Sequence, residues 1–270
     1  MSDPKIHTYA DGSISYWDLG TGPCILMVHG FCEDKSMFES FLGLSKKNRL
    51  IIPDLPGFGG SSIPLGKGQM RTYAQALHSL IQALDLKDIH FIGHSMGTYA
   101  GLELLDSYKP SFKTFSIFHS HPFADSVAIR KKRQKSIDFI HKHGTSAFFK
   151  PFFANLFPSS KQSLFTEKIE ALAEASKDIS AAAIIYAQEA MADRRDHSKT
   201  LEQFGGITQY IVGQLDEIAP AELGLQQILL SKVGLFHLIE DCGHMGQWEK
   251  PAIILKHFQE LLKISETLKR

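Results

Sequence analysis

The feature that most constrains the fold is an alternation of short apolar runs with amphipathic segments of helical length. Each apolar run has three to five residues and is bounded by turn-forming residues, a length typical of a buried strand rather than a helix. Between several runs lie segments such as Thr72–Leu84 and Met96–Ser107, whose apolar residues recur with helical spacing. Strands that alternate with helices predict a mostly parallel sheet covered on both faces. The predicted strands are Cys24–Val28, Leu50–Ile52, Ile89–Ile92, Phe115–Phe118, Tyr210–Val212 and Leu235–Ile239.

Two parts of the chain depart from this alternation. Near the start, Asp11-Gly12 joins the runs Ile6–Tyr9 and Ile14–Trp17, a hairpin signal that predicts an antiparallel edge. Between about residues 120 and 200, the pattern favours consecutive helices inserted after the Phe115–Phe118 strand. Such an insertion would cover the carboxyl ends of the strands, where ligands bind in open α/β sheets. We therefore expect a core of residues 1–120 and 201–270 and a helical lid of residues 121–200, with helices at Val127–His141, Ser146–Asn155, Gln162–Ala175 and Ile179–Asp193.

The most specific motif is Gly93-His94-Ser95-Met96-Gly97, a G-x-S-x-G that lies between a predicted strand and a predicted helix. A serine at the tip of such a turn is held in strained backbone geometry that exposes its hydroxyl above the sheet. The two glycines let the strand and helix backbones approach where a Cβ would collide. The helix N-terminus also directs backbone N–H groups at developing negative charge. We therefore expect Ser95 to be a nucleophile.

A nucleophilic serine needs a base, and the base needs an acid that orients it. His244 follows the last predicted strand and Asp216 follows the strand before it, so both are expected at the same end of the sheet as Ser95. The chain order Ser, Asp, His is also the one expected for a serine on a strand-to-helix turn. Two other acids remain open as the orienting group: Glu217, which adjoins Asp216, and Asp125, which follows the Phe115–Phe118 strand.

Two backbone N–H groups are the expected donors to an oxyanion. One belongs to Met96, the residue after the nucleophile, and the other to Phe31, in the loop after the third predicted strand. Gly30 would allow that loop to turn toward the site, while the neighbouring Cys32 is expected to take no part in catalysis. The apolar residues of the predicted lid suggest an apolar ceiling. The residues expected around the substrate pocket are His29, Gly30, His119, His121, Phe152 and Met245.

The histidines and cysteines do not form a pattern of metal ligands or disulfides. His119 and His121 form an H-x-H, but no third ligand with suitable spacing accompanies them, so we expect neither a metal nor a cofactor. Cys24, Cys32 and Cys242 are an odd set without metal-ligand spacing, which disfavours a disulfide framework. A reducing cytoplasm is the expected location.

The charge balance argues against a nucleic-acid or membrane partner. Lysine plus arginine equals aspartate plus glutamate at 29 each, so no overall field favours a polyanion. The run Arg130-Lys131-Lys132-Arg133 lacks interleaved aromatic residues, so we predict a solvated helix face there. No stretch approaches the roughly 18 apolar residues of a membrane span. The first residues, MSDPKIHTYADG, also lack the apolar core of a signal peptide.

Five ordered motifs, spread over almost the whole chain, resemble the lid-bearing α/β-hydrolase superfamily. The resemblance implies an eight-stranded sheet with helices on both faces, and the serine, acid, histidine and oxyanion donors assigned above. It also implies that Asp54 belongs to a structural turn rather than to the catalytic set. The motifs are VHGF at Val28–Phe31, PDLPGFGGS at Pro53–Ser61, GHSMG at Gly93–Gly97, VGQLDEIAP at Val212–Pro220 and CGHMGQWEKP at Cys242–Pro251.

The resemblance leaves more than one reaction open. Haloalkane dehalogenases and epoxide hydrolases of this fold use an aspartate where this chain has Ser95, which disfavours both activities. Cofactor-free haloperoxidase-like esterases carry a proline at the position of Cys32. Carbon–carbon bond hydrolases and strigolactone-type receptors share the Ser-Asp-His set and remain alternatives. We hypothesise a carboxylesterase-like enzyme that cleaves a small, largely apolar ester; the sequence does not determine the oligomeric state.

Overall fold

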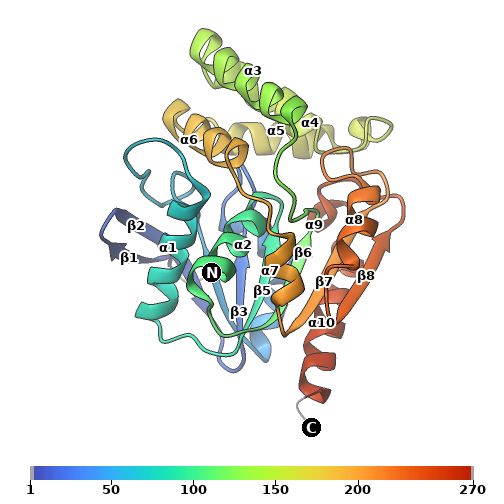
Figure 1. Ribbon diagram of the computed structural model, residues 1–270. Coiled ribbons are helices and arrows are strands. Elements are labelled where there is room, and N and C mark those ends of the chain that lie inside the picture. The colour runs from blue at the N-terminus through green and yellow to red at the C-terminus, as the bar shows by residue number, and fades with distance from the viewer. Residues whose placement is uncertain (1–2, 269–270) are drawn as a thin grey trace.

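An eight-stranded sheet forms the centre of the protein, whose residues 3–268 are described by a computed structural model (Figure 1). The strand order is β1-β2-β4-β3-β5-β6-β7-β8. Pairing is antiparallel from β1 through β2 to β4 and parallel from there on, which confirms the predicted mostly parallel sheet with a hairpin at its edge. The strands are β1 (Lys5–Tyr9), β2 (Gly12–Leu19), β3 (Cys24–Val28), β4 (Arg49–Pro53), β5 (Ile89–His94), β6 (Phe112–Phe118), β7 (Ile207–Gly213) and β8 (Gly234–Ile239).

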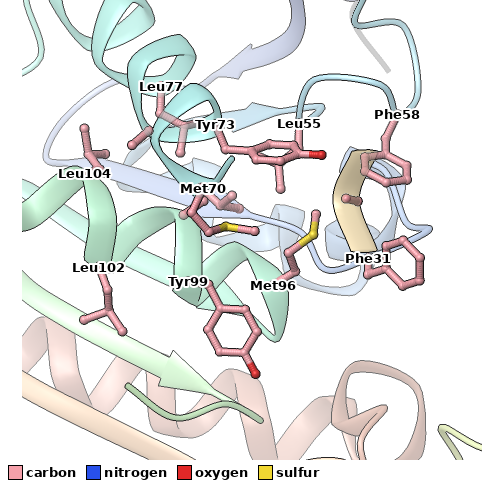
Figure 2. Close-up of a cluster of buried hydrophobic side chains, with 14 of the residues drawn as sticks. Phe31, Leu55, Phe58, Met70, Tyr73, Leu77, Met96, Tyr99, Leu102 and Leu104 are labelled. Atoms are coloured by element: carbon pink, nitrogen blue, oxygen red, sulfur yellow. The ribbon is translucent and has the colours of Figure 1, made fainter. Parts of the chain in front are cut away.

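Alternate side chains along the strands build one hydrophobic core on each face of the sheet. In β3, Leu26 and Val28 join one core while Ile25 and Met27 join the other, because successive side chains of a strand point to opposite faces. Figure 2 shows part of the first core, which includes Met96 at the start of α2. This core is covered by α1 (Met70–Ala83), α2 (Met96–Tyr108), α7 (Ser198–Gln203) and α8 (Ala221–Ile228), and the second by η1 (Lys35–Lys46), α9 (Gly246–Glu249) and α10 (Pro251–Thr267).

The segment between β6 and β7 forms a group of helices, here called the helical insertion, at one end of the sheet (Figure 1). Its helix α3 packs on α6, and α4 packs on α5. The predicted helix Gln162–Ala175 is divided into a 3-10 turn and an α-helix, and the expected lid boundary at residue 200 falls inside α7, which contacts α2 of the core. The insertion contains α3 (Val127–His143), α4 (Ser146–Ala154), η2 (Gln162–Phe165), α5 (Thr166–Ala175) and α6 (Ala181–Ala192).

Two further findings concern the three cysteines and the search for a membrane-spanning helix. Cys24, Cys32 and Cys242 are all buried and free. Among residues 3–268, no helix combines the length and the apolar character that crossing a bilayer requires.

Candidate active site

The loops that follow five neighbouring strands each bring one residue to the same edge of the sheet. Phe31 follows β3, Ser95 follows β5, His119 follows β6, Asp216 follows β7 and His244 follows β8. These strands are adjacent and parallel, so their carboxyl ends lie together. The sheet therefore gathers residues that are more than 200 positions apart in the chain.

Ser95 occupies a strained turn between β5 and α2. Its φ is 48° and its ψ is −117°, a backbone conformation that side-chain-bearing residues rarely adopt. A Cβ on Gly97 would lie 2.2 Å from the carbonyl oxygen of Val28, so only glycine permits this approach of helix to strand. Two hydrogen bonds hold the turn: Ser95 N–H donates to the carbonyl of Phe118 (3.0 Å), and the Ser120 hydroxyl donates to the carbonyl of Ser95 (2.9 Å).

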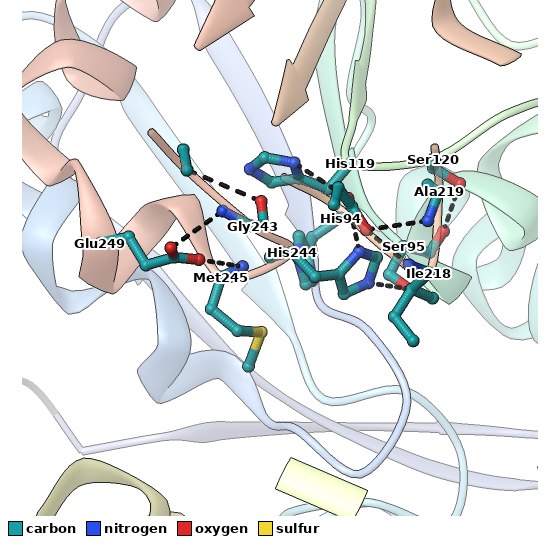
Figure 3. Close-up of polar contacts among 12 residues, drawn as sticks. His94, Ser95, His119, Ser120, Ile218, Ala219, Gly243, His244, Met245 and Glu249 are labelled. Atoms are coloured by element: carbon teal, nitrogen blue, oxygen red, sulfur yellow. Dashed lines mark hydrogen bonds and ion pairs between the residues drawn. The ribbon is translucent and has the colours of Figure 1, made fainter. Parts of the chain in front are cut away.

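Ser95, His244 and Asp216 form one chain of hydrogen bonds, of which Figure 3 shows the part between Ser95 and His244. His244 Nε2 lies 2.9 Å from Ser95 Oγ, and His244 Nδ1 lies 2.8 Å from Asp216 Oδ2. Because the carboxylate accepts the Nδ1–H, Nε2 is left to accept from the serine hydroxyl. The sequence-predicted serine, base and acid are thus brought together, and we refer to them as the trio.

Asp216 is held in its charged form by its surroundings. Its second oxygen, Oδ1, accepts from the backbone N–H groups of Ile218 (2.9 Å) and Ala219 (2.8 Å). Burial alone would raise the pKa of this carboxyl, but the imidazole and hydrogen bond of His244, together with the nearby imidazole of His119, hold the pKa well below its usual range. His119 Nδ1 lies 3.4 Å from Asp216 Oδ2. Burial lowers the pKa of His119 to about 4, so its ring is neutral near neutral pH.

The backbone of the His244 loop is tied to the helical insertion. The N–H of His244 donates to the carbonyl of Leu156, just after α4, at 3.1 Å. On the other side of the same loop, Glu249 accepts from the N–H groups of Gly243 (2.9 Å) and Met245 (3.0 Å) (Figure 3). The imidazole is therefore carried by a loop that is fixed on both sides.

The two expected oxyanion donors flank the trio. Phe31 and Ser95 line the same cavity, and Met96 is the first residue of α2. No acceptor in the described part of the chain takes the N–H of Phe31 or of Met96. Both N–H groups are therefore unpaired among residues 3–268.

A buried ion pair, absent from the sequence predictions, lies beside the trio. His94 Nδ1 is 3.0 Å from Glu33 Oε2, and His94 Nε2 is 3.0 Å from the carbonyl of His244. Both of these partners accept, so both ring nitrogens carry protons. Glu33 also accepts from the N–H of Gly30 at 2.7 Å and from Gln247 Nε2 at 3.3 Å. The pair thus connects the Phe31 loop to the His244 loop.

The pKa shifts of this pair follow from its burial and its mutual charge. Burial disfavours the charged form of His94, but the negative charge of Glu33 and the hydrogen bond to it raise the His94 pKa overall. Burial likewise opposes ionisation of Glu33, yet the charge and hydrogen bond of His94 lower its pKa overall. No motif signalled this pairing, because a glutamate in a loop is usually solvated.

A cavity of about 160 Å³ opens beside Ser95 and His244. Of the residues expected around the pocket, Phe152 lines this cavity and His121 lines the neighbouring one. The other four lie elsewhere: His119 is turned to Asp216, while Met245 and Gly30 belong to the packed loops behind the trio. His29 is also displaced from the expected position, because its Nδ1–H donates to Gly30 O (2.7 Å) and its Nε2 accepts the N–H of Leu55 (2.8 Å).

The alternative acids make other contacts. Glu217 is exposed, and its carboxylate lies within hydrogen-bonding distance of the Ser159 hydroxyl (3.4 Å). Asp125 is buried between two guanidinium groups, those of Arg133 and Arg194. Neither carboxylate contacts His244.

The prediction of a solvated face for the run from residue 130 to 133 is wrong for Arg133. Its side chain is 18% exposed, binds Asp125 and lines the cavity beside Ser95, whereas the rest of the run is exposed. The signal that could have found this is helical spacing, because Arg133 lies four and seven residues before Ile137 and Ile140, the buried residues of α3.

Among residues 3–268, three side chains are grouped closely enough to hold a metal ion, namely His237 on β8 with His257 and Glu260 on α10. His257 Nδ1 already bonds to Glu260 at 2.9 Å, and the Gln209 side chain bonds to His237. His119 and His121 are not part of this group. Ser95, His244 and Asp216 are not part of this group either.

Comparison with protein families decides the classification. A model described as alpha/beta hydrolase fold matches residues 23–251. The chain belongs to the alpha/beta hydrolase fold family. Among solved structures, a thermophilic esterase from Thermogutta terrifontis superposes on this hydrolase-fold chain with a TM-score of 0.90 at 25% identity, covering 98% of this chain and 99% of the other.

Curated relatives of this family member carry several names. Lipase 1 of Psychrobacter immobilis is 28% identical over 243 residues, which are 84% of this chain and 73% of the relative. A putative non-heme chloroperoxidase of Synechocystis sp. is 37% identical over 97 residues, so this chain spans about a third (35%) of that relative's length. These two names denote different reactions.

Proposed function

We propose that this member of the alpha/beta hydrolase fold family is a carboxylesterase-like serine hydrolase, with Ser95 as nucleophile, His244 as base and Asp216 as the orienting acid. The observation that carries the proposal is the continuous chain of hydrogen bonds, 2.9 Å and 2.8 Å long, from Ser95 through His244 to Asp216. A neutral imidazole held in this way accepts a proton from the serine hydroxyl.

The proposed reaction has two halves. As Ser95 Oγ bonds to the ester carbonyl carbon, its proton moves to His244 Nε2, and Asp216 stabilises the imidazolium. When the carbon–oxygen bond of the ester breaks, His244 returns that proton to the departing alcohol and leaves an acyl group on Ser95. Water then attacks the acyl carbon by the same path, with its proton taken by His244, and releases the acid and free serine.

The developing oxyanion is proposed to lie against the N–H groups of Phe31 and Met96. Both N–H groups are unpaired within residues 3–268, and donors of this kind act without reorganisation. Loss of one such donor typically costs about 10²–10³ in kcat.

We further propose that the helical insertion acts as a lid and that the cavity beside Ser95 binds the acyl group. Phe152, Leu156 and Met191 of the insertion supply apolar wall to this cavity of about 160 Å³. An esterase and a lipase among the similar proteins are consistent with an ester substrate. We keep the cytoplasm as the proposed location, in line with three buried free thiols.

Labelling with a fluorophosphonate probe, followed by hydrolysis of short p-nitrophenyl esters, tests the proposal. Ser95→Ala should abolish labelling and lower kcat/KM by about 10³-fold or more. Ser107→Ala, on the same helix, is the matched control and should behave as the wild type. Wild-type turnover by Ser95→Ala would show that the nucleophile is misassigned.

Two further outcomes separate the proposal from its alternatives. Turnover of diketones without turnover of esters would favour a carbon–carbon bond hydrolase at the same trio. A single slow turnover per protein molecule would favour a ligand sensor.

A further inference from the structure

A second and larger cavity adjoins the one beside Ser95. Its volume is about 570 Å³, and it lies between the helical insertion and the loops after β6 and β7. Four residues line both cavities: Tyr99, Arg133, Gln188 and Ile218. The two cavities are therefore neighbours, and these four side chains form the wall between Ser95 and the larger space.

Two guanidinium groups face this larger cavity and share one carboxylate. Arg133 and Arg194 both line the cavity and both form ion pairs with Asp125. The side chain of Arg194 is 3% exposed, and its guanidinium lies 3.9 Å from the centre of the Tyr99 ring. Exposed Lys132 and Glu217 at the rim balance one another. The buried group of two cations and one anion is therefore left with one net positive charge.

The donors of the two arginines are not used up by the protein. Arg133 uses Nε for Asp125 and Nη1 for Gln188, while its Nη2 reaches Asp125 only at 3.5 Å. Arg194 uses Nε for the carbonyl of Phe123 and Nη1 for Asp125 and the carbonyl of Met191. No hydrogen bond among the described residues engages Arg194 Nη2. Arg133 Nη2 thus keeps one N–H beyond its long bond to Asp125, and Arg194 Nη2 keeps both of its N–H groups.

A buried histidine adds an unpaired polar atom to the same wall. His121 lines the larger cavity, is 9% exposed, and its Nδ1 has no hydrogen-bond partner among residues 3–268. Burial, followed by the charge of Arg194, lowers the pKa of His121 to about 4, so the ring is neutral near neutral pH and carries one N–H. Nδ1 itself is buried beneath the cavity surface, so His121 borders the two guanidinium groups as a neutral ring.

We propose that Arg133, Arg194 and His121 form a subsite for a carboxylate of the substrate. This inference rests on the proposed ester hydrolysis and names its substrate class: esters that carry a carboxylate several bonds away from the scissile carbonyl. One net positive charge matches one carboxylate, and the planar guanidinium suits its geometry. Phe123, Ile129 and Leu223 supply apolar wall for the hydrocarbon between the two groups. The substrate is then apolar in its middle and charged at its far end.

Matched ester pairs test the substrate class. We would measure kcat/KM for the mono-p-nitrophenyl esters of adipic and suberic acids, each against the analogue whose free carboxylate is replaced by a carboxamide. The wild type should prefer the carboxylate at one or both chain lengths by about tenfold or more, as expected for a hydrogen-bonded charge. Equal kcat/KM within both pairs would overturn the subsite.

Substitutions on α3 test whether the preference for the carboxylate ester arises at the subsite. Arg133→Gln should lower the ratio of carboxylate to carboxamide kcat/KM by about tenfold, and Arg133→Lys should restore part of it. Arg130→Gln, which alters an exposed arginine one turn away on the same helix, should leave the ratio unchanged. A ratio that Arg133→Gln leaves unaltered would overturn the assignment.

Binding of adipate itself separates the subsite from the reaction. Free adipate should raise the Tm of the wild type and of Arg130→Gln, but less so that of Arg133→Gln. Stabilisation through Arg133 without any ester cleavage would refute the proposed reaction and retain the subsite. Cleavage of uncharged esters by Ser95 without adipate binding would retain the reaction and refute the subsite. If Arg133→Gln does not fold, the preference of the wild type between carboxylate and carboxamide decides.

Discussion

Replacing Glu33 by glutamine tests how far a buried charge supports the trio. Glu33 and His94 have side chains that are 2% and 1% exposed, and their ion pair links the Phe31 loop to the His244 loop. Glutamine keeps the shape and one acceptor oxygen, but it removes the charge that stabilises protonated His94. Breaking a buried ion pair by removing one partner costs about 3–5 kcal/mol. Because His94 can deprotonate and the amide can still accept from Gly30, we expect about 2–3 kcal/mol of lost stability.

The loss should depend on pH in a definite direction. A raised histidine pKa contributes stability that is fully present below about pH 6.5 and is lost as the pH rises through the folded-state pKa of His94. A lowered glutamate pKa contributes stability that is present above about pH 4.3 and is lost as the pH falls through the folded-state pKa of Glu33. The difference between wild type and Glu33→Gln should therefore be largest between about pH 4.5 and 6.5 and smaller near about pH 9.5.

Thermal unfolding at these pH values is the measurement. At about 2–4 °C per kcal/mol for a chain of this size, Glu33→Gln should lower the Tm by roughly 4–12 °C near pH 6. It should also lower kcat/KM, because Glu33 holds the N–H of Gly30 next to the proposed oxyanion donor. Glu39→Gln, which alters an exposed glutamate of η1, should change the Tm by about 1 °C or less. An equal loss of Tm at pH 6 and pH 9.5, or no loss, would refute the reasoning.

Two further predictions concern the nucleophile turn and the thiols. Gly97→Ala places a Cβ 2.2 Å from the Val28 carbonyl oxygen, so it should lower both the Tm and the esterase kcat. Gly43→Ala, where nothing lies within 4 Å of the added Cβ, should lower neither. Equal effects of the two variants would contradict the packing argument. Burial raises the pKa of Cys24 to about 12 and that of Cys32 well above its usual value. Iodoacetamide at pH 8 should therefore leave ester hydrolysis intact. Inactivation by alkylation of native Cys32 would contradict a serine nucleophile acting alone.

The strand pattern could be read from the sequence because burial on two faces produces continuous apolar runs. Each of the eight predicted strands lies within an observed one. The ends differ by up to three residues, at β6, which begins at Phe112 rather than Phe115, and at β7, which begins at Ile207 rather than Tyr210. The positions of Ser95, Asp216 and His244 also followed from the strands, since each of these residues comes directly after one. Helix η1 is absent from the prediction, although its buried Met37, Phe41 and Leu44 recur with a helical spacing that could have indicated it.

The remaining features of the site depend on partners that are distant in the chain. Glu33 pairs with a histidine 61 positions away, and Arg133 shares its carboxylate with Arg194, also 61 positions away. A charged residue read by itself is assigned to solvent, because most such residues are exposed. The sequence predicts His29 at the pocket, whereas its ring accepts the backbone N–H of Leu55.

The hydrogen bond from His244 N–H to the Leu156 carbonyl has a mechanical consequence. Withdrawing Leu156 would break this bond, so a movement of the insertion would also free one side of the loop that carries the imidazole. One movement of the insertion would then change both the access to the cavity and the support of the His244 loop. If the insertion opens as the proposed lid, the His244 loop would then be held on one side only, by the Glu249 carboxylate.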